Sequence, residues 1–423
     1  MMSNTNDGGS RISTAPAFSL KKNSMLIALV ALMIGFQIMI TVSDTGSFFT
    51  STNITNLIAQ NSYVVILAVG MLICILTGGN IDLSVGSGVC MISAIGGVLI
   101  VNNGVNIYLS MFICILLGIG IGAFQGYFIA YVRIPAFIVT LAGMMIFRGV
   151  GYVILGGYTI SPFPDEFIRI FNGFIPPTGS SESFRVGVTM AIAVALCAVI
   201  VVTQVLTRIR KVKKNYTVES AGAMVIKLAI ICAVIIYVLY LLSQNKGLPI
   251  VLITVGIIIL AYQFYTSKTV PGRHLYAMGG NEKAAIFSGV NTNKVMFFAY
   301  TNMGFLVAVA SLVCLARFNS AAPTAGTGYE LDAIGACFIG GASAYGGAGT
   351  IGGTVIGAVF MGVLNNGMSI LGIDANWQRV VKGAALLIAV FLDVQAKRKR
   401  GASLKGIFGL GRPDKPKAEK QQN

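Results

Sequence analysis

The chain has 423 residues, of which 55% are hydrophobic and only 10% are charged, and its formal net charge at pH 7 is +16. This composition excludes an ordinary soluble protein. Apolar runs of about 20 residues are long enough to cross a bilayer core as helices, and they lack the polar/apolar alternation of membrane β-barrel strands. The composition therefore predicts an all-α fold, a polytopic transmembrane helical bundle.

The basic residues lie mainly in short connections and in the C-terminal tail, with clusters at Arg208–Lys214 and Lys397–Arg400. This is the distribution of cytoplasmic loops beside anionic lipid rather than of a nucleic-acid site. We therefore expect membrane lipid as a partner and no nucleic acid.

Catalytic and metal chemistry has little support in the sequence. His274 is the single histidine, and the seven cysteines lie in apolar runs without metal-ligand or redox spacing. The chain contains no Gly-x4-Gly-Lys-Ser/Thr loop, so we do not expect it to hydrolyse ATP itself. We therefore expect a protein that is not an enzyme and that binds neither a metal nor a cofactor.

Apolar stretches divide the chain into about 10 to 12 spans, some of them broken helices. In chain order they are Met25–Val42, Ser62–Thr77, Ser84–Val101, Tyr108–Tyr131, Ala136–Leu155, Gly187–Leu206, Ala223–Leu242, Leu248–Tyr265, Val295–Leu315, Leu331–Ala344, Ile351–Leu371 and Trp377–Leu392. Residues 331–344 form the shortest span. They are needed to keep the basic tail on the same side as the other basic loops, and a buried broken helix can cross in this way.

Residues 1–24 are predicted to be a disordered cytoplasmic N-terminus, not a cleavable signal, and residues 25–395 a transmembrane domain. Residues 396–423 are predicted to be a basic cytoplasmic tail. The loop 43–61 carries no Lys or Arg and should face outside.

Two further features concern the membrane interface. The external loop 158–186 holds an amphipathic piece, Phe167–Phe171, which either lies along the outer interface or belongs to an irregular loop. Arg379 and Lys382 lie near the start of the last span, where we expect their long side chains to reach the interface.

The segment Thr77–Ser87 places glycines, Asn80, Asp82 and Ser84 between two spans. An ionisable group within the membrane is costly and usually functional. Asp82 either caps the following helix, as Ser84 also can, or takes a direct part in a transport path. The sequence leaves both interpretations open.

Two later motifs carry the same ambiguity. Glu330 and Asp332 begin the short span, where acids suit a helix N-terminus but can also meet sugar hydroxyls or a docking protein. Asn365 and Asn366 lie within a span, where amides either hold helices together or line a path.

A polar island, residues 267–294, interrupts the apolar sequence and should face the cytoplasm. Within it, Lys283-Ala284-Ala285-x3-Gly289 predicts a short helix with a glycine stop. Its alanine face either enters a cleft on a cytoplasmic partner or belongs to a solvated loop.

Several motifs together resemble the sugar permeases of bacterial ABC importers in the ribose/xylose/galactose group. They are Gly78–Ser87, Phe137–Gly143, Tyr276–Glu282 and Tyr329–Ala336, and the resemblance runs from about residue 50 to residue 395. The stretch 223–242 and the motif Pro323–Glu330 are most similar to xylose or multiple-monosaccharide permeases.

The resemblance implies a permease homodimer in the bacterial inner membrane, driven by a cytoplasmic ATP-binding subunit and supplied by an extracytoplasmic sugar-binding protein. Such permeases hold their ATPase through a coupling helix with a Glu-Ala-Ala-x3-Gly pattern, in which Lys283 here replaces the acid and Glu282 precedes it. The coupling residues it implies are Gly279, Gly280, Asn281, Glu282, Lys283, Ala284, Ala285 and Gly289.

We therefore expect a transport subunit that imports a monosaccharide by alternating access. The residues expected along the sugar path are Asn80, Asp82, Ser84, Glu330, Asp332, Asn365 and Asn366. The alternative is a secondary, ion-coupled transporter of small solutes, for which Asp82 or Asp332 would be the coupling acid.

Overall fold

The computed structural model describes residues 24–44, 46–214, 216 and 220–407. The predicted disordered N-terminus lies outside this range, apart from residue 24. The predicted tail begins as helix, because the last helix continues through residue 407, and residues 408–423 lie outside the described part.

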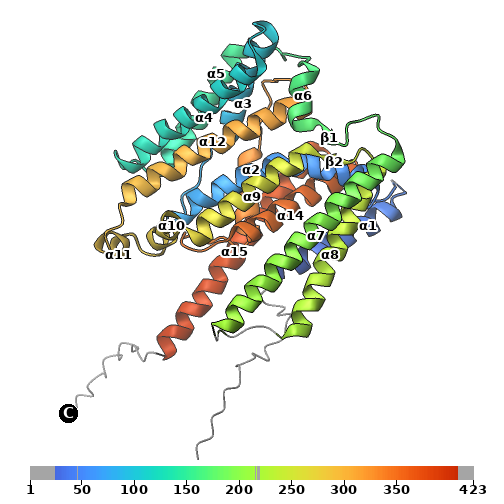
Figure 1. Cartoon of the computed structure of the whole chain (residues 1–423). Helices are drawn as coiled ribbons and strands as arrows, with labels where there is room; N and C mark the ends of the chain where they lie inside the picture. Colours follow the sequence, from blue (N-terminus) through green and yellow to red (C-terminus); the bar gives the residue numbers. More distant parts are fainter. Residues whose placement is uncertain (1–23, 45, 215, 217–219, 408–423) are drawn as a thin grey trace, which may run out of the picture.

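Helices account for almost all of the described structure (Figure 1). They are α1 (Ser24–Val42), α2 (Ser51–Leu76), α3 (Val85–Gly97) with the π-helical turn Val98–Asn102, α4 (Ile107–Ala130), α5 (Ala136–Leu155), α6 (Asp165–Asn172), α7 (Glu182–Lys213), α8 (Ala221–Gln244), α9 (Ile250–Lys268), α10 (Val270–Gly280), α11 (Glu282–Phe287), α12 (Thr292–Phe318), α13 (Tyr329–Ile339), α14 (Ile351–Ile370) and α15 (Ala375–Ile407). Strands β1 (Phe174–Ile175) and β2 (Leu248–Pro249) pair antiparallel at one end of the bundle.

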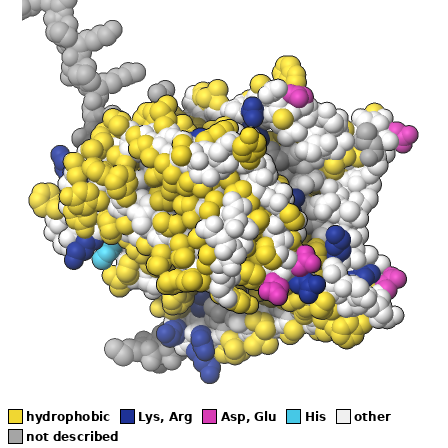
Figure 2. Space-filling view, turned by 90° about the horizontal axis from the view of Figure 1, so that it is seen from above, with side chains coloured by type: hydrophobic (Ala, Val, Ile, Leu, Met, Phe, Trp, Pro, Cys, Tyr) yellow, Lys and Arg dark blue, Asp and Glu magenta, His cyan; other side chains and the backbone are white. Residues whose placement is uncertain are grey.

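The predicted all-α membrane bundle is confirmed. Ten helices of the described part are long and apolar enough to cross a membrane. In the view of Figure 2, hydrophobic side chains gather over the left half of the face, and several charged side chains lie together at the lower right. A surface of this kind suits contact with lipid.

The predicted spans 331–344 and 377–392 are not among the ten. Helix α13 ends at Ile339 because Gly341, which adopts a φ of +88°, turns the chain. A loop then carries Gly347 to α2, where its backbone N–H donates to the carbonyl of Leu76. The chain therefore returns to the end of the bundle that holds α10, although no continuous helix makes the crossing.

The predicted boundary at Ser62 is also wrong, because α2 begins at Ser51. Its first turns contain Asn53 and Asn61, and polar amides of this kind are typical of an external loop. Both side chains instead bond to α14 inside the protein: Asn53 to Asn366, and Asn61 to the carbonyl of Ala358.

The amphipathic piece of the external loop is helical, as α6, and packs on α12 and α9. Phe167 is completely buried beside Phe163 and Phe171, with ring centroids 5.3 and 6.4 Å away. This helix therefore buries its apolar face against the bundle.

Helices α2 and α12 form the centre of the bundle. Both are largely buried, whereas α1, α7, α8 and α9 have few buried residues. Helix α12 packs closely along α4, where Gly304 meets Gly118 and Gly122 backbone to backbone. Small residues allow such approach where lipid removes the hydrophobic drive for helix association.

We expect Gly122→Val to weaken the fold. A Cβ at Gly122 would lie 2.3 Å from the carbonyl oxygen of Tyr300, whereas a Cβ at Gly120, two residues away, would meet nothing within 4 Å. Overpacking of this kind costs about 1–3 kcal/mol or more. The thermal unfolding midpoint in detergent should fall for Gly122→Val and change little for the control Gly120→Val. Equal midpoints would show that this contact does not limit stability.

Candidate functional site

The predicted short helix of the polar island is present as α11. The side chain of Asn281 caps it by accepting a hydrogen bond from the backbone N–H of Ala284 at 3.0 Å. Gly289, with a φ of +84°, turns the chain just beyond its end. The island is thus two helices, α10 and α11, joined at Asn281.

Helix α10 is held to the end of α2. A Cβ at Gly279 would lie 1.9 Å from the carbonyl oxygen of Leu76 and 2.4 Å from the backbone nitrogen of Gly347. No other residue fits between these backbones. The end of α10, the end of α2 and the loop before α14 therefore form one close-packed joint.

Helix α11 is tied to the α4–α5 connection by Arg133. Its guanidinium lies 3.0 Å from a carboxylate oxygen of Glu282 and also bonds to Asn293 at the start of α12. Both charged side chains are about half exposed, at 48% and 42%, so the pair contributes little stability. The pair nevertheless shows that α11 lies directly against the α4–α5 connection.

The exposed surface of α11 differs from the predicted alanine face. Ala284 is exposed, but Ala285 is only 4% exposed and faces the bundle. The exposed apolar side chains are Ile286, at 49%, and Phe287, at 90%. The signal in the sequence is an Ile-Phe pair inside an otherwise polar island.

Asn80 lies beside the island. It lines a cavity of about 450 Å³ together with Arg133, Gly280 and Glu282. Its amide donates to the carbonyl of Thr77 at 3.3 Å. The structure thus places Asn80 at a cavity next to the island, two residues before Asp82.

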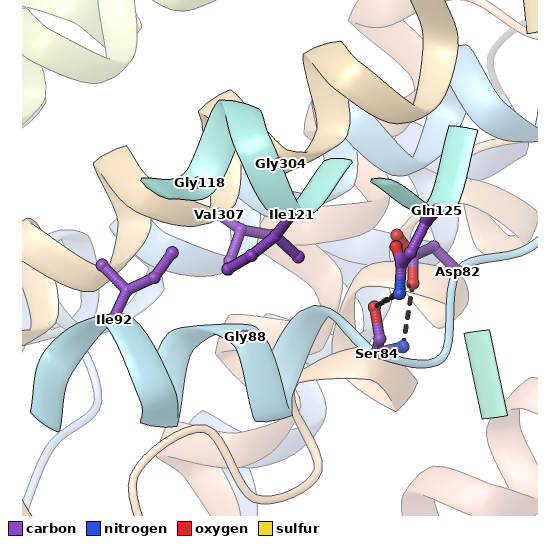
Figure 3. A pocket seen from close by; sticks show the side chains of 9 residues that line it. All are labelled: Asp82, Ser84, Gly88, Ile92, Gly118, Ile121, Gln125, Gly304 and Val307. Carbon is purple, nitrogen blue, oxygen red and sulfur yellow. Dashed lines mark hydrogen bonds between the residues drawn. The ribbon is translucent and has the colours of Figure 1, made fainter. Parts of the chain in front are cut away.

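Asp82 and Ser84 lie together in the bundle interior, between α2 and α3 (Figure 3). One carboxylate oxygen of Asp82 accepts from the backbone N–H of Ser84 at 2.8 Å and from its hydroxyl at 2.7 Å. The amide of Gln125, on α4, donates to the same hydroxyl at 2.8 Å. Ser84 makes no side-chain cap to α3, so Asp82 is the residue that orders this break.

The cavity beside Asp82 has a volume of about 10 Å³, roughly enough for one water molecule. No sugar fits there in this conformation. Gln125 was missed from the sequence, although it is an amide in an otherwise apolar span.

Asp332 and Asn365 are brought together with a partner that the sequence did not indicate. The Asp332 carboxylate, 2% exposed, lies 2.9 Å from the ammonium of Lys382 on α15, and Asn365 hydrogen-bonds to the same carboxylate. The prediction that Lys382 reaches the interface is therefore wrong, because its side chain is only 16% exposed. Arg379 is exposed and bonds to Asn376.

Glu330 is half-buried at the start of α13, where it approaches Gly86 of α3. Nearby, the guanidinium of Arg148 on α5 donates to the carbonyls of Pro323 at 3.2 Å and Ala325 at 2.6 Å. Arg148 was missed too, although it is the only charged residue in α5.

Asn366 forms a reciprocal amide pair with Asn53, with N···O distances of 2.9 and 3.0 Å. This pair joins α14 to α2, as amides do between membrane helices. Of the seven predicted path residues, the structure therefore joins Asp82 to Ser84 and Asp332 to Asn365 by hydrogen bonds, and it places Glu330 in the same first turn of α13 as Asp332. Asn80 and Asn366 bond to other groups.

Comparison with known proteins decides the family. A family model described as "Branched-chain amino acid transport system / permease component" matches residues 53–390. The chain belongs to this family of transport permeases. The sequence is also 34% identical over 390 residues to the xylose transport system permease protein of Escherichia coli (strain K12), covering 92% of this chain and 97% of the relative.

Two further relatives are similar to the permease over most of its length. The xylose transport system permease protein of Haemophilus influenzae is 35% identical, covering 89% of this chain and 96% of the relative. The ribose import permease protein of Escherichia coli (strain K12) is 34% identical, covering 86% and 92%. No solved structure matches the permease. The resemblance seen in the sequence motifs is confirmed, and the permease is a multi-pass membrane protein.

We expect Lys382→Met to destabilise the permease by about 3–5 kcal/mol, because it leaves the buried Asp332 carboxylate without its cation. The control Arg379→Met removes an exposed cation three residues away and should be nearly neutral. Thermal unfolding in detergent measures both. The double variant Asp332→Leu/Lys382→Met should regain part of the lost stability, because neither charge is then left unpaired. A double variant less stable than either single variant would contradict the pairing.

Proposed function

We propose that this permease is the membrane subunit of an ATP-driven importer of monosaccharides, either a xylose-like sugar or several sugars. Its relatives are named for xylose and ribose transport, which supports sugar as the cargo. The observation that carries the ATP-driven part is α11, which presents a 90% exposed Phe287 from a helix fixed by contacts on two sides.

An exposed aromatic side chain is an anchor for a partner protein. A cleft on a separate ATP-binding subunit covers Ile286 and Phe287, and that subunit hydrolyses the ATP. A sugar-binding protein delivers the cargo on the opposite face of the bacterial inner membrane, and two copies of the permease form the working unit.

The mechanism follows from the joints around α11. When the ATPase subunits close, α11 moves with them. Glu282 pulls on Arg133, and hence on the α4–α5 connection, while Gly279 pushes on the end of α2. Because α2 is a largely buried central helix, its displacement changes the packing of α12, α13 and α14, opening one side of the path and closing the other.

We retain the predicted residues as part of this proposal, in three roles. Asp82 and Ser84 order the break between α2 and α3, and Glu330 and Asp332 with Asn365 form the polar start of α13. Asn80 and Asn366 lie at the two ends of α2, where motion must be transmitted. The ion-coupled alternative has less support, because Asp332 is already neutralised by Lys382.

We expect Phe287→Asp to uncouple the permease from its ATPase. Loss of a central aromatic anchor costs about 2 kcal/mol or more, which is roughly a thirtyfold loss of affinity. Copurification of the ATP-binding subunit and ATP-dependent uptake into proteoliposomes should both fall. Phe287→Leu, which keeps an apolar side chain, and Lys283→Gln, an exposed change on the same helix, are the controls. Normal copurification and uptake by Phe287→Asp would remove α11 from the proposal.

The orientation of the permease in the membrane is tested separately with reporter tags. Tags after Arg210, near Asn281 and at the C-terminus should report the cytoplasm, and tags near Thr52 and Thr178 should report the outside, because basic residues concentrate on the cytoplasmic side. A tail found outside would mean that residues 329–350 do not return the chain across the membrane.

A further inference from the structure

A polar cavity of about 210 Å³ lies within one protomer, where α2, α12 and α14 meet. Its lining residues are Gln60, Asn61, Tyr63, Val64, Arg317, Phe318, Gly362, Asn365 and Ser369. Phe318 ends α12 and Ser369 lies in the last turn of α14. The cavity therefore lies toward the end of the bundle opposite α11, the end proposed to face outside.

Three of the lining residues carry a buried polar atom without a hydrogen-bond partner in the described structure. These atoms are Oδ1 of Asn61, Oδ1 of Asn365 and Nε of Arg317. A buried polar atom left unpaired costs about 1–3 kcal/mol. The residues that carry these atoms also give the cavity wall amide and guanidinium groups, which indicates a site for a polar occupant.

Arg317 adds a second peculiarity. The ion pairs within the described residues join Arg133 to Glu282 and Lys382 to Asp332, so this partly buried guanidinium has no carboxylate beside it. It lies next to the rings of Phe318 and the tyrosines Tyr63 and Tyr329. A planar guanidinium presents several N–H donors in fixed directions.

The side chains of the lining select the chemistry of the occupant. The amides of Gln60, Asn61 and Asn365 each offer a donor and an acceptor, and the guanidinium of Arg317 offers donors. An anion supplies only acceptors and a cation only donors, whereas a hydroxyl group supplies both. Val64 and Phe318 give apolar contact area for the C–H groups of a small ring.

We propose that this cavity binds a neutral polyhydroxylated molecule of monosaccharide size, so that each permease copy holds its own sugar site on the outer side of the path. The inference rests on the proposed sugar import. It assigns the permease a part in selecting the cargo, beside the sugar-binding protein. Asn365 connects the site to the interior, because it also bonds to Asp332, which is paired with Lys382 of α15.

The test uses the purified full-length permease without its partners, so that the sugar-binding protein contributes nothing. D-Xylose and D-ribose should each raise its thermal unfolding midpoint by about 2 °C or more beyond the shift they give to Arg317→Lys, because a ligand that binds only the folded state stabilises it. Sugars stabilise proteins non-specifically as osmolytes, and the variant removes that contribution from the comparison.

A second variant guards against misfolding. Gln60→Leu alters an exposed lining residue and should also reduce the sugar-dependent shift, while Arg379→Met, outside the cavity, should keep the full shift. Equal shifts in wild type, Arg317→Lys and Gln60→Leu would mean a cavity filled only by water and would overturn the inference. A larger shift with sodium D-xylonate than with D-xylose would overturn the neutral character of the ligand.

ATP-dependent uptake in proteoliposomes with both partners separates the two proposals. Sugar uptake without a specific shift leaves the proposed function standing and removes this site. Absence of sugar uptake by the complete wild-type system removes the proposed function itself. Uptake by wild type that falls several-fold in Arg317→Lys at equal protein, together with the lost shift, supports both.

Discussion

Close backbone packing at glycines is the constraint on which the rest of this structure depends. Lipid offers no hydrophobic drive for helices to associate, so their association must be stabilised by van der Waals contacts at short range. At Gly304 a Cβ would lie 2.1 Å from the carbonyl oxygen of Gly118, and at Gly326 it would lie 1.9 Å from that of Gly86. These contacts bring α12 against α4, and the loop before α13 against α3.

The same packing links α10 and the loop before α14 to the centre of the bundle. Gly279 and Gly347 meet the end of α2 without room for any side chain. A joint made of backbone cannot yield by a change of rotamer, so it passes displacement on instead of absorbing it. A transport subunit needs such a property wherever motion must pass from one end of the bundle to the other.

Buried charged side chains form a second constraint, because they are paired or hydrogen-bonded inside the protein. Lys382 neutralises Asp332, and Arg148 bonds to backbone carbonyls of the loop before α13. Charges in a low-dielectric interior are tolerated only when they are paired or hydrogen-bonded. Arg317 and the amides around it depart from this rule, and they do so at a cavity.

The apolar composition and the positions of the basic residues determined, without any structure, that the chain is a helical membrane bundle with a polar island between two spans. These features follow from transfer free energies, which depend on the residue itself and little on its neighbours. The short α11 helix was also predictable, because its glycine stop acts locally. Tertiary structure alone decided which polar groups meet. Lys382 and Asp332 are 50 residues apart in the chain, and the direction of a lysine side chain depends on which helix packs beside it. The start of α2 was misjudged for the same reason, since Asn53 is acceptable within a membrane helix only because Asn366 faces it.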